Sequence, residues 1–197
     1  MKIAVFGGAF NPIHLGHVAL AKELKQNIGA KKVLIIPSHL SPHKSSEQLV
    51  SGEDRLNMCR LAFEGMTGFE VSGIEIEMQG ISYTANTLLK LKEQYPNDDI
   101  YLFMGADMFV TLNLWYEPQT IFSLCTLCTV PRNDIDADVL TKKANEYQKK
   151  GAKSVILDIP LYDVSSTELR NGLKTEHLPE RVYEYIKAKG LYNGKIH

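Results

Sequence analysis

Short apolar runs recur along the chain and are separated by longer polar stretches. The runs cover 3–6, 33–36, 100–104, 124–130 and 155–159. Most of their residues are apolar at both odd and even positions, which is typical of strands buried on both faces of a parallel sheet. We therefore predict five strands at these places.

The polar stretches between the runs carry the periodicity of helices. Ala21, Leu24 and Ile28 recur with the spacing i, i+3, i+7 after the first run. Further helices are expected over 53–65 (with Ser51 as its N-cap), 84–95, 137–150 and 179–189. The alternation predicts an α/β fold with a doubly wound, mostly parallel, Rossmann-like sheet. Ligands of such sheets bind beyond the carboxyl ends of the strands, which directs attention to the residues after each run.

The length and net charge of the chain limit the number of domains and the classes of ligand that we expect. A chain of 197 residues fits one domain, so we expect a single domain over 1–197. Its 22 basic and 23 acidic residues give a net charge of −1, whereas proteins that bind nucleic-acid polymers usually show a basic excess. We therefore expect small-molecule substrates and no nucleic-acid polymer. The oligomeric state stays open, and a homodimer is compatible with the sequence.

The cellular location follows from what the chain lacks. It has no N-terminal leader pattern and no apolar run near the roughly 18 residues that span a bilayer. We expect a cytoplasmic protein without membrane contact. Cys59, Cys125 and Cys128 are too few to indicate a disulfide framework, and we expect them in the core rather than in a redox site.

The first strand is followed by a segment suited to phosphate. Gly7-Gly8 lets the backbone approach a ligand closely, and a helix is expected to start near His14 or Leu15. A helix N-terminus offers unpaired N–H groups to an anion. His14 and His17 are three residues apart, which places both imidazoles on one helix face. Neither a Walker lysine nor a G-x-G-x-x-G fingerprint is present.

This segment resembles the nucleotidyltransferase superfamily whose members carry His-x-Gly-His after their first strand. Its full form, Gly-Gly-x-Phe-x-Pro-x-His-x-Gly-His, is similar to that of bacterial nicotinate-nucleotide adenylyltransferases. The resemblance implies a Rossmann-like nucleotidyltransferase fold. It also implies contacts to ATP from Gly7, Gly8, Ala9, Phe10, His14, Gly16 and His17.

The segment 164–170 supplies a second candidate for the phosphate site. Ser165 and Glu168 have the spacing of a capping box, which needs no ligand to explain it. The same stretch resembles the Ser-Ser-Thr-x-x-Arg motif of the superfamily. That resemblance implies contacts to ATP from Ser165, Ser166, Thr167 and Arg170, where the guanidinium suits phosphate oxygens. With His14 and His17, Arg170 is the third expected catalytic residue.

The region 105–116 is expected to bind the second substrate. The run from Gly105 and Asp107 to Trp115 and Tyr116 resembles the pyridine-binding region of nicotinate-nucleotide adenylyltransferases. In that family the tryptophan stacks on the pyridine ring, a role that suits an aromatic face. Backbone N–H groups hold the nicotinate carboxylate there, and the matching positions are Thr84 and Tyr116.

Two further basic residues lie where the family binds nucleotide. Lys44, in Ser-Pro-His-Lys, stands where the family has Pro-Pro-His-Lys and could meet a substrate phosphate. Arg132, in Pro-Arg-Asn-Asp, takes the place of an Arg-Pro-Gly pattern near the adenylate. No protein metal site is expected, and Mg²⁺ is expected to arrive with ATP.

The resemblance implies transfer of AMP from ATP to nicotinate mononucleotide, with release of pyrophosphate. The attacking phosphate is already anionic, so we expect direct in-line attack without a covalent enzyme intermediate. Nicotinamide-mononucleotide and phosphopantetheine adenylyltransferases are the alternatives. Met78 and Asn86 replace residues common in the family, which leaves a non-catalytic nucleotide-binding regulator as a remote third reading.

Overall fold

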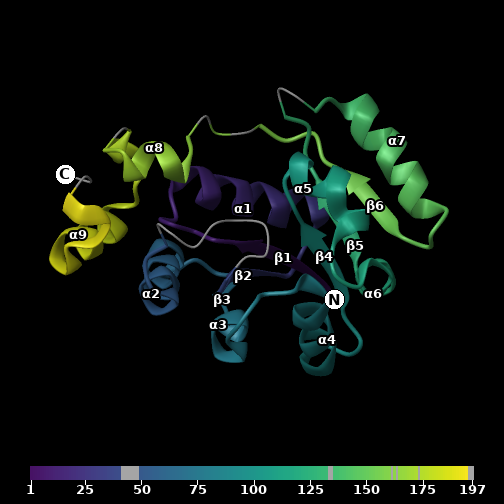
Figure 1. Ribbon diagram of the computed structural model, residues 1–197, viewed down its shortest axis with the longest axis horizontal. Helices are drawn as coiled ribbons and strands as arrows, with labels where there is room; N and C mark the ends of the chain where they lie inside the picture. The colour runs from purple at the N-terminus through teal and green to yellow at the C-terminus, as the bar shows by residue number, and fades with distance from the viewer. Residues whose placement is uncertain (41–48, 133–134, 161, 163, 173, 195–197) are drawn as a thin grey trace. The chain divides into compact units, whose positions relative to one another are not determined.

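We describe a computed structural model of the protein, which covers residues 1–40, 49–132, 135–160, 162, 164–172 and 174–194 (Figure 1). In these residues the strands form a six-stranded sheet in the order β3-β2-β1-β4-β5-β6. The strands are β1 (Lys2–Gly8), β2 (Lys32–Pro37), β3 (Phe69–Val71), β4 (Asp99–Phe103), β5 (Thr126–Thr129) and β6 (Lys153–Ile156). The pairs β1–β4, β4–β5 and β5–β6 run parallel. The predicted doubly wound α/β fold is confirmed.

Helices connect the strands throughout the described residues. The α-helices are α1 (Leu15–Ile28), α2 (Gly52–Phe63), α3 (Ile74–Met78), α4 (Thr84–Gln94), α5 (Ala106–Thr111), α6 (Pro118–Leu124), α7 (Ala137–Gln148), α8 (Ser166–Arg170) and α9 (Glu180–Lys189). Three short 3₁₀ turns are η1 (Leu112–Leu114), η2 (Thr175–His177) and η3 (Leu191–Gly194). No helix in this part of the chain is long and apolar enough to cross a membrane.

The chain divides into two compact units, each assembled from separate segments. The first contains 1–7, 23–33 and 83–160, and the second contains 8–22, 34–82 and 161–197. In the first unit, the side chain of Tyr147 on α7 is buried against the rings of Phe109 and Phe122. Its hydroxyl donates to the carbonyl of Phe109 at 2.7 Å. Helix α7, which the sequence predicts over 137–150, is therefore anchored through this tyrosine.

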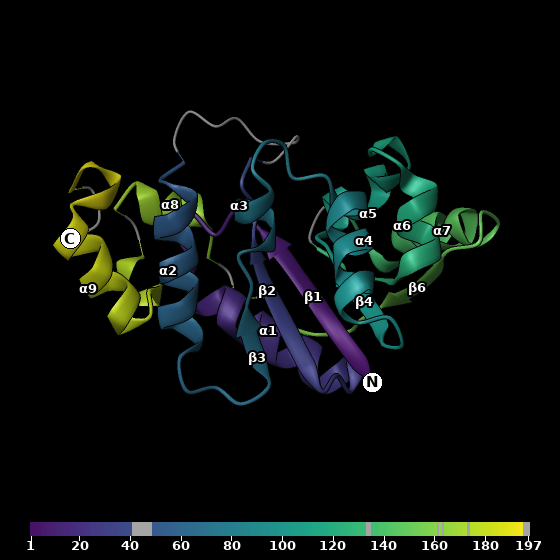
Figure 2. The ribbon, with the colours of Figure 1, turned by 90° about the horizontal axis from the view of Figure 1, so that it is seen from below.

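In the second unit, helix α9 packs against α2, although the two are far apart in sequence (Figure 2). The hydroxyl of Tyr185 donates to Asp54 Oδ1 at 2.8 Å, and Arg181 forms an ion pair with Glu64. The C-terminal helix ends at Gly190, whose φ of 60° suits glycine. This packing brings the last described turn, η3, into the same unit as the segment after β1.

Several predicted boundaries were wrong. Gly7 and Gly8 were expected in a loop but end β1, because the carbonyl of Gly8 still accepts a hydrogen bond from Ser38 N at 2.9 Å. The run 124–130 begins in a helix, since Leu124 is the last residue of α6. Strand β6 covers 153–156 rather than 155–159. Strand β3 was missed because it has three residues and only two of them are apolar.

Candidate active site

The two histidines of the first motif form one stacked pair in the second unit. Helix α1 starts at Leu15, so His14 precedes it and His17 lies in its first turn. Their ring centroids are 3.6 Å apart with an interplanar angle of 28°. The ring of Phe10 meets His17 edge-on at 5.1 Å. The two imidazoles lie together as expected, although His14 precedes the helix and only His17 lies in it.

Hydrogen bonds fix which nitrogen of each ring carries the proton. The backbone N–H of His14 donates to Nδ1 of His17 at 3.3 Å, and the N–H of His17 donates to Nδ1 of His14 at 3.3 Å. A nitrogen that accepts a hydrogen bond bears no proton, so each neutral ring carries its proton on Nε2. Burial and, to a smaller extent, the nearby His177 lower the pKa of His14 to about 4. His14 is therefore a neutral Nε2–H donor near pH 7.

Gly16 is required by close approach rather than by its backbone angles. A Cβ on this residue would lie 2.9 Å from Val164 Cγ1, 3.0 Å from His14 Nδ1 and 3.0 Å from Tyr162 Cβ. Real Cβ atoms essentially never come closer than 3.0 Å to a neighbour. The glycine between the two histidines therefore lets the chain after β6 pack against the start of α1.

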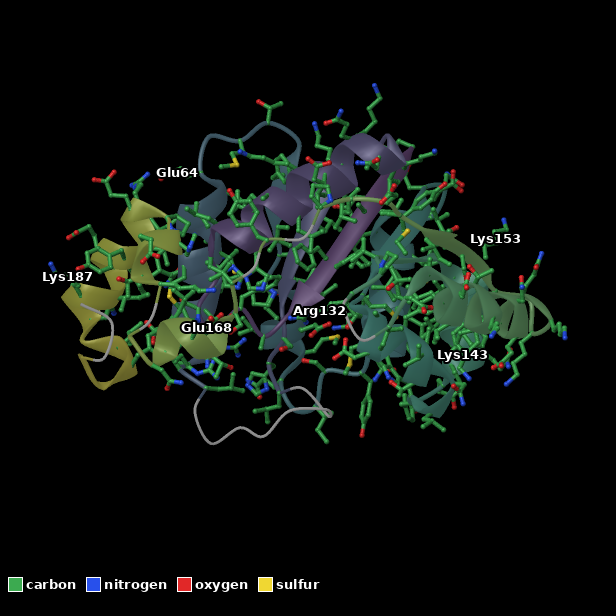
Figure 3. The ribbon with its side chains drawn as sticks, turned by 90° about the horizontal axis from the view of Figure 1, so that it is seen from above. Glu64, Arg132, Lys143, Lys153, Glu168 and Lys187 are labelled. Carbon is green, nitrogen blue, oxygen red and sulfur yellow. The ribbon has the colours of Figure 1, made fainter. Side chains whose placement is uncertain are left out.

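Helix α8 is held by the capping box that its sequence predicts. Ser165 Oγ accepts from the N–H of Glu168, and the carboxylate of Glu168 (labelled in Figure 3) accepts from the N–H of Ser165 at 2.9 Å. Hydrogen bonds from Lys174 and Ser165 lower the pKa of Glu168, which keeps the carboxylate charged.

Helix α8 is also tied to the segment after β1. Ser166 Oγ donates to the carbonyl of Pro12 at 3.0 Å. Arg170 Nη1 donates to the carbonyl of Asn11 at 2.8 Å, and its Nη2 donates to Thr167 Oγ1 at 3.1 Å. Arg170 Nε is buried without a hydrogen-bond partner in the described part of the chain. The structure therefore brings the two predicted phosphate segments together, and their contacts with ATP remain predictions.

Sequence reasoning missed three residues that support this segment: Asn11, Arg55 and Tyr192. Arg55 on α2 is 1% exposed and donates to the carbonyl of Ala9 at 2.8 Å. The hydroxyl of Tyr192 donates to Asn11 Oδ1 at 3.0 Å in a buried contact. Arg55 could have been noticed in the sequence, because the apolar residues Cys59, Ala62 and Phe63 share its helical face. A charged residue on such a face usually has a defined set of partners.

The first unit holds the aromatic residues expected to bind the pyridine ring. Trp115 is half-buried directly after η1, and Tyr116 is 52% exposed. The ring of Tyr116 packs against Tyr83, with centroids 4.6 Å apart. Tyr83 is the N-cap of α4, and Thr84 is that helix's first residue. The two positions expected to present N–H groups to a carboxylate, Thr84 and Tyr116, are thus connected through one ring contact.

Gly105 and Asp107 occupy the start of α5, directly beyond β4. Gly105 is the N-cap, and a Cβ there would lie 2.8 Å from Asp107 Oδ1. The carboxylate of Asp107 is exposed and lies against this glycine. The predicted position after a parallel strand is confirmed for both residues, and their role in binding the second substrate remains a prediction.

The two remaining basic candidates differ in what the structure describes. Arg132 (labelled in Figure 3) is exposed after β5, and its backbone pairs with Ile135 in both directions, at 3.0 and 2.8 Å. Lys44 lies outside the described residues. In the described residues, no group of three or more His, Cys, Asp or Glu side chains could hold a metal ion.

Burial of the three cysteines agrees with the expected core role. Desolvation raises the pKa of Cys125 and of Cys128 to about 12, and it raises the pKa of Cys59 further. Thiols this resistant to ionisation are poor nucleophiles. Cys125 caps the end of α6 while Cys128 lies in β5, so the pair does not lie within one strand as expected.

Comparisons with known proteins agree with this architecture. The model of the family described as cytidylyltransferase-like matches residues 5–172. A curated relative from Shewanella woodyi, named as a probable nicotinate-nucleotide adenylyltransferase, is 34% identical over 98% of this chain and 99% of its own length. A relative of the same name from Clostridium tetani is 35% identical over 97% and 98%.

A solved structure shares the fold at lower sequence identity. The Plasmodium falciparum nicotinic acid mononucleotide adenylyltransferase complexed with NaAD is 20% identical, covers 98% of this chain and 97% of its own, and has a TM-score of 0.76. This similarity supports the fold, whereas the curated relatives support the family. The chain belongs to the nicotinate-nucleotide adenylyltransferases within the cytidylyltransferase-like family.

Proposed function

We propose that this protein transfers the adenylyl group of ATP to nicotinate mononucleotide, giving nicotinate adenine dinucleotide and pyrophosphate. The observation that carries the proposal is the stacked pair of His14 and His17. Their reciprocal hydrogen bonds place the proton of each neutral ring on Nε2, beside the N-terminus of α1. Such preorganised donors stabilise the negative charge that grows on phosphate oxygens in the transition state.

In the proposed reaction, a 5′-phosphate oxygen of nicotinate mononucleotide attacks the α-phosphorus of ATP. The bond from the α-phosphorus to the oxygen bridging to the β-phosphate breaks, and pyrophosphate leaves with that electron pair. No proton has to be removed from the attacking phosphate, so no general base or covalent nucleophile is needed. Binding and charge stabilisation by His14, His17 and Arg170 then supply the catalysis.

We expect Mg²⁺ to arrive bound to the triphosphate, where it would neutralise phosphate charge. The described residues include no three-ligand group suited to a resident metal. We assign no protein ligand to the ion. Arg170 contributes a fixed positive charge instead, because Asn11 and Thr167 hold its guanidinium.

The acceptor is proposed from the family and from the aromatic group in the first unit. Relatives from Shewanella woodyi and Clostridium tetani carry the name of an enzyme acting on nicotinate nucleotide. Trp115 offers a flat face to a pyridine ring, and neutral N–H donors near Thr84 and Tyr116 suit a carboxylate better than a carboxamide. We therefore favour nicotinate over nicotinamide mononucleotide and over phosphopantetheine.

Pyrophosphate release tests the proposal when ATP and Mg²⁺ are mixed with each acceptor separately. We expect release with nicotinate mononucleotide, less with nicotinamide mononucleotide and none with phosphopantetheine. Release with phosphopantetheine alone would overturn the acceptor, and release with none would favour a nucleotide-binding regulator.

The His17→Ala variant tests the mechanism. Its turnover should fall about 100-fold or more, the loss expected for one preorganised donor. Gln26→Ala on the exposed face of the same helix serves as the control and should keep normal turnover. Near-normal turnover in folded His17→Ala protein would rule out the proposed role of the histidine pair.

A further inference from the structure

Arg55 is a buried charge that the reaction described above does not use. It is 1% exposed and is the largest fully buried side chain in the described residues. Burial lowers the pKa of its guanidinium, and the nearby charge of Glu75 only partly offsets this effect. Placing a charged group in such surroundings is costly, and an apolar side chain of similar volume often fills such a space at lower cost. Space filling therefore does not explain an arginine here.

Each nitrogen of the guanidinium donates to the backbone of a different segment of the second unit. Nη1 donates to the carbonyl of Ala9 at 2.8 Å, Nη2 to the carbonyl of His39 at 3.1 Å, and Nε to the carbonyl of Val50 at 3.1 Å. A planar fork can satisfy three divergent acceptors at once, whereas the compact ammonium of lysine cannot span them. Arg55 therefore connects the segment after β1, the segment after β2 and the start of α2.

The segment after β1 is held at neighbouring atoms as well. Asn11 Oδ1 accepts from Val50 N at 3.3 Å and from the hydroxyl of Tyr192 at 3.0 Å. The carbonyl of Asn11 accepts from Arg170. Between these anchors, Phe10 has a φ of 45°, an uncommon conformation for a residue with a side chain, which persists only where the surroundings determine it. The contacts of Arg55 with Ala9 and of Tyr192 with Asn11 are part of the surroundings that hold Phe10 in this conformation.

We propose that Arg55 is a positioning residue for adenylyl transfer: it fixes the backbone of 9–11 and thereby the placement of His14 and His17. In this proposal Arg55 acts through the backbone, because its three guanidinium nitrogens all donate to backbone carbonyls. The expected effect on turnover rests on the proposed function. The fixing of the 9–11 backbone rests on the hydrogen bonds of the second unit alone. Tyr192 supports the same backbone through the side chain of Asn11.

Two variants test this role, with a matched pair as the control. Arg55→Met fills the space without donors, and Arg55→Lys keeps the charge but loses the fork. Arg60 lies on the same helix, is exposed, and bonds only Asn57 among its described contacts, so Arg60→Met and Arg60→Lys are the controls. We expect kcat of Arg55→Met to fall about 100-fold, the effect of a misplacement near 1 Å, with a much smaller change in the KM for ATP. Arg55→Lys should lie between this variant and the original protein.

Backbone hydrogen exchange supplies a readout that does not depend on turnover. We expect faster exchange over 9–17 in both Arg55 variants, with exchange in the first unit unchanged. Uniformly faster exchange, or a loss of kcat that only follows the unfolded fraction, would mean a general structural role and overturn the proposal. Unchanged exchange over 9–17 would overturn it as well.

A third variant covers the case in which Arg55→Met does not fold. Tyr192→Phe keeps the ring and removes only the hydroxyl that donates to Asn11 Oδ1. This variant should fold, and its backbone amides over 9–17 should still exchange faster than those of the original protein. If the unmodified protein uses an acceptor other than nicotinate mononucleotide, the proposed function fails. The Arg55 variants are then compared with that acceptor, and the exchange measurement stands in either case.

Discussion

Replacing Gly16 by alanine should harm both the stability and the turnover of the protein. The residue is the second of α1, where alanine normally gains up to about 1 kcal/mol over glycine. Against this, the new methyl group would lie 2.9 Å from Val164 Cγ1 and 3.0 Å from both His14 Nδ1 and Tyr162 Cβ. Overpacking of this kind costs about 1–3 kcal/mol. The clash should win, because a Cβ atom cannot move without its backbone.

The loss of activity should exceed the loss of stability. His14 Nδ1, which the methyl group would displace, accepts the N–H of His17 and so fixes the orientation of the pair. We expect a net destabilisation of up to about 2 kcal/mol after the full helix gain is subtracted, and turnover lowered at least about tenfold. Urea unfolding and pyrophosphate release measure the two effects.

Gly52→Ala is the matched control, since Gly52 also begins a helix of the second unit. Its Cβ would closely approach only the half-buried side chain of Ile76, at 3.2 Å, and a shift of a few tenths of an ångström relieves that contact. We expect nearly unchanged stability and turnover for this variant. A Gly16→Ala protein that is as stable and as active as the Gly52→Ala protein would refute the reasoning from close approach.

Two further predictions concern protonation and capping. The folded-state pKa of His14 is about 4, below its ordinary 6.5, so its contribution to stability is present above pH 6.5 and is lost as the pH falls toward 4. Between pH 7 and 5 the free energy of unfolding, measured in urea, should fall by about 2 kcal/mol through this group. His14→Asn should remove that part of the dependence on pH. An equal dependence in both proteins would contradict the prediction. Ser165→Ala removes the acceptor for the N–H of Glu168, so it should lower the free energy of unfolding by about 1 kcal/mol and raise the KM for ATP. Ser165→Thr keeps a hydroxyl and should stay close to the original protein in both quantities. Equal values in the two variants would contradict a capping role.

The elements that the sequence predicted well depend on local rules. The stacking of His14 and His17 follows from their spacing on one helix turn, and the capping box of Ser165 follows from a spacing of three residues. The placement of Gly105 follows from its position directly after an apolar strand. In each case a few adjacent residues contain all the information.

The features that the sequence could not predict depend on contacts across the chain. The acceptors of Arg55 are backbone carbonyls, which every residue has, so no residue type marks them. The partner of Tyr192 is Asn11, 181 positions away. Strand β3 exists through sheet pairing and not through a long apolar run. For the same reason the sequence pattern placed Gly7 and Gly8 after the first strand. The hydrogen bond from Ser38 N to the carbonyl of Gly8 instead extends β1 through Gly8.

The hydrogen bond from Tyr192 to Asn11 has a consequence for how the protein is made. The ribosome releases the segment after β1 early, yet one of its supports lies near the end of the chain and another, Arg170, lies 159 positions beyond Asn11. Contacts between such distant residues form late, because closing the intervening loop is entropically costly. A nascent chain that lacks η3 can complete much of its sheet, but its first motif would still be without one of the contacts that hold Asn11. Nucleotide should therefore bind more weakly to a nascent chain that stops before residue 192 than to the full 197 residues.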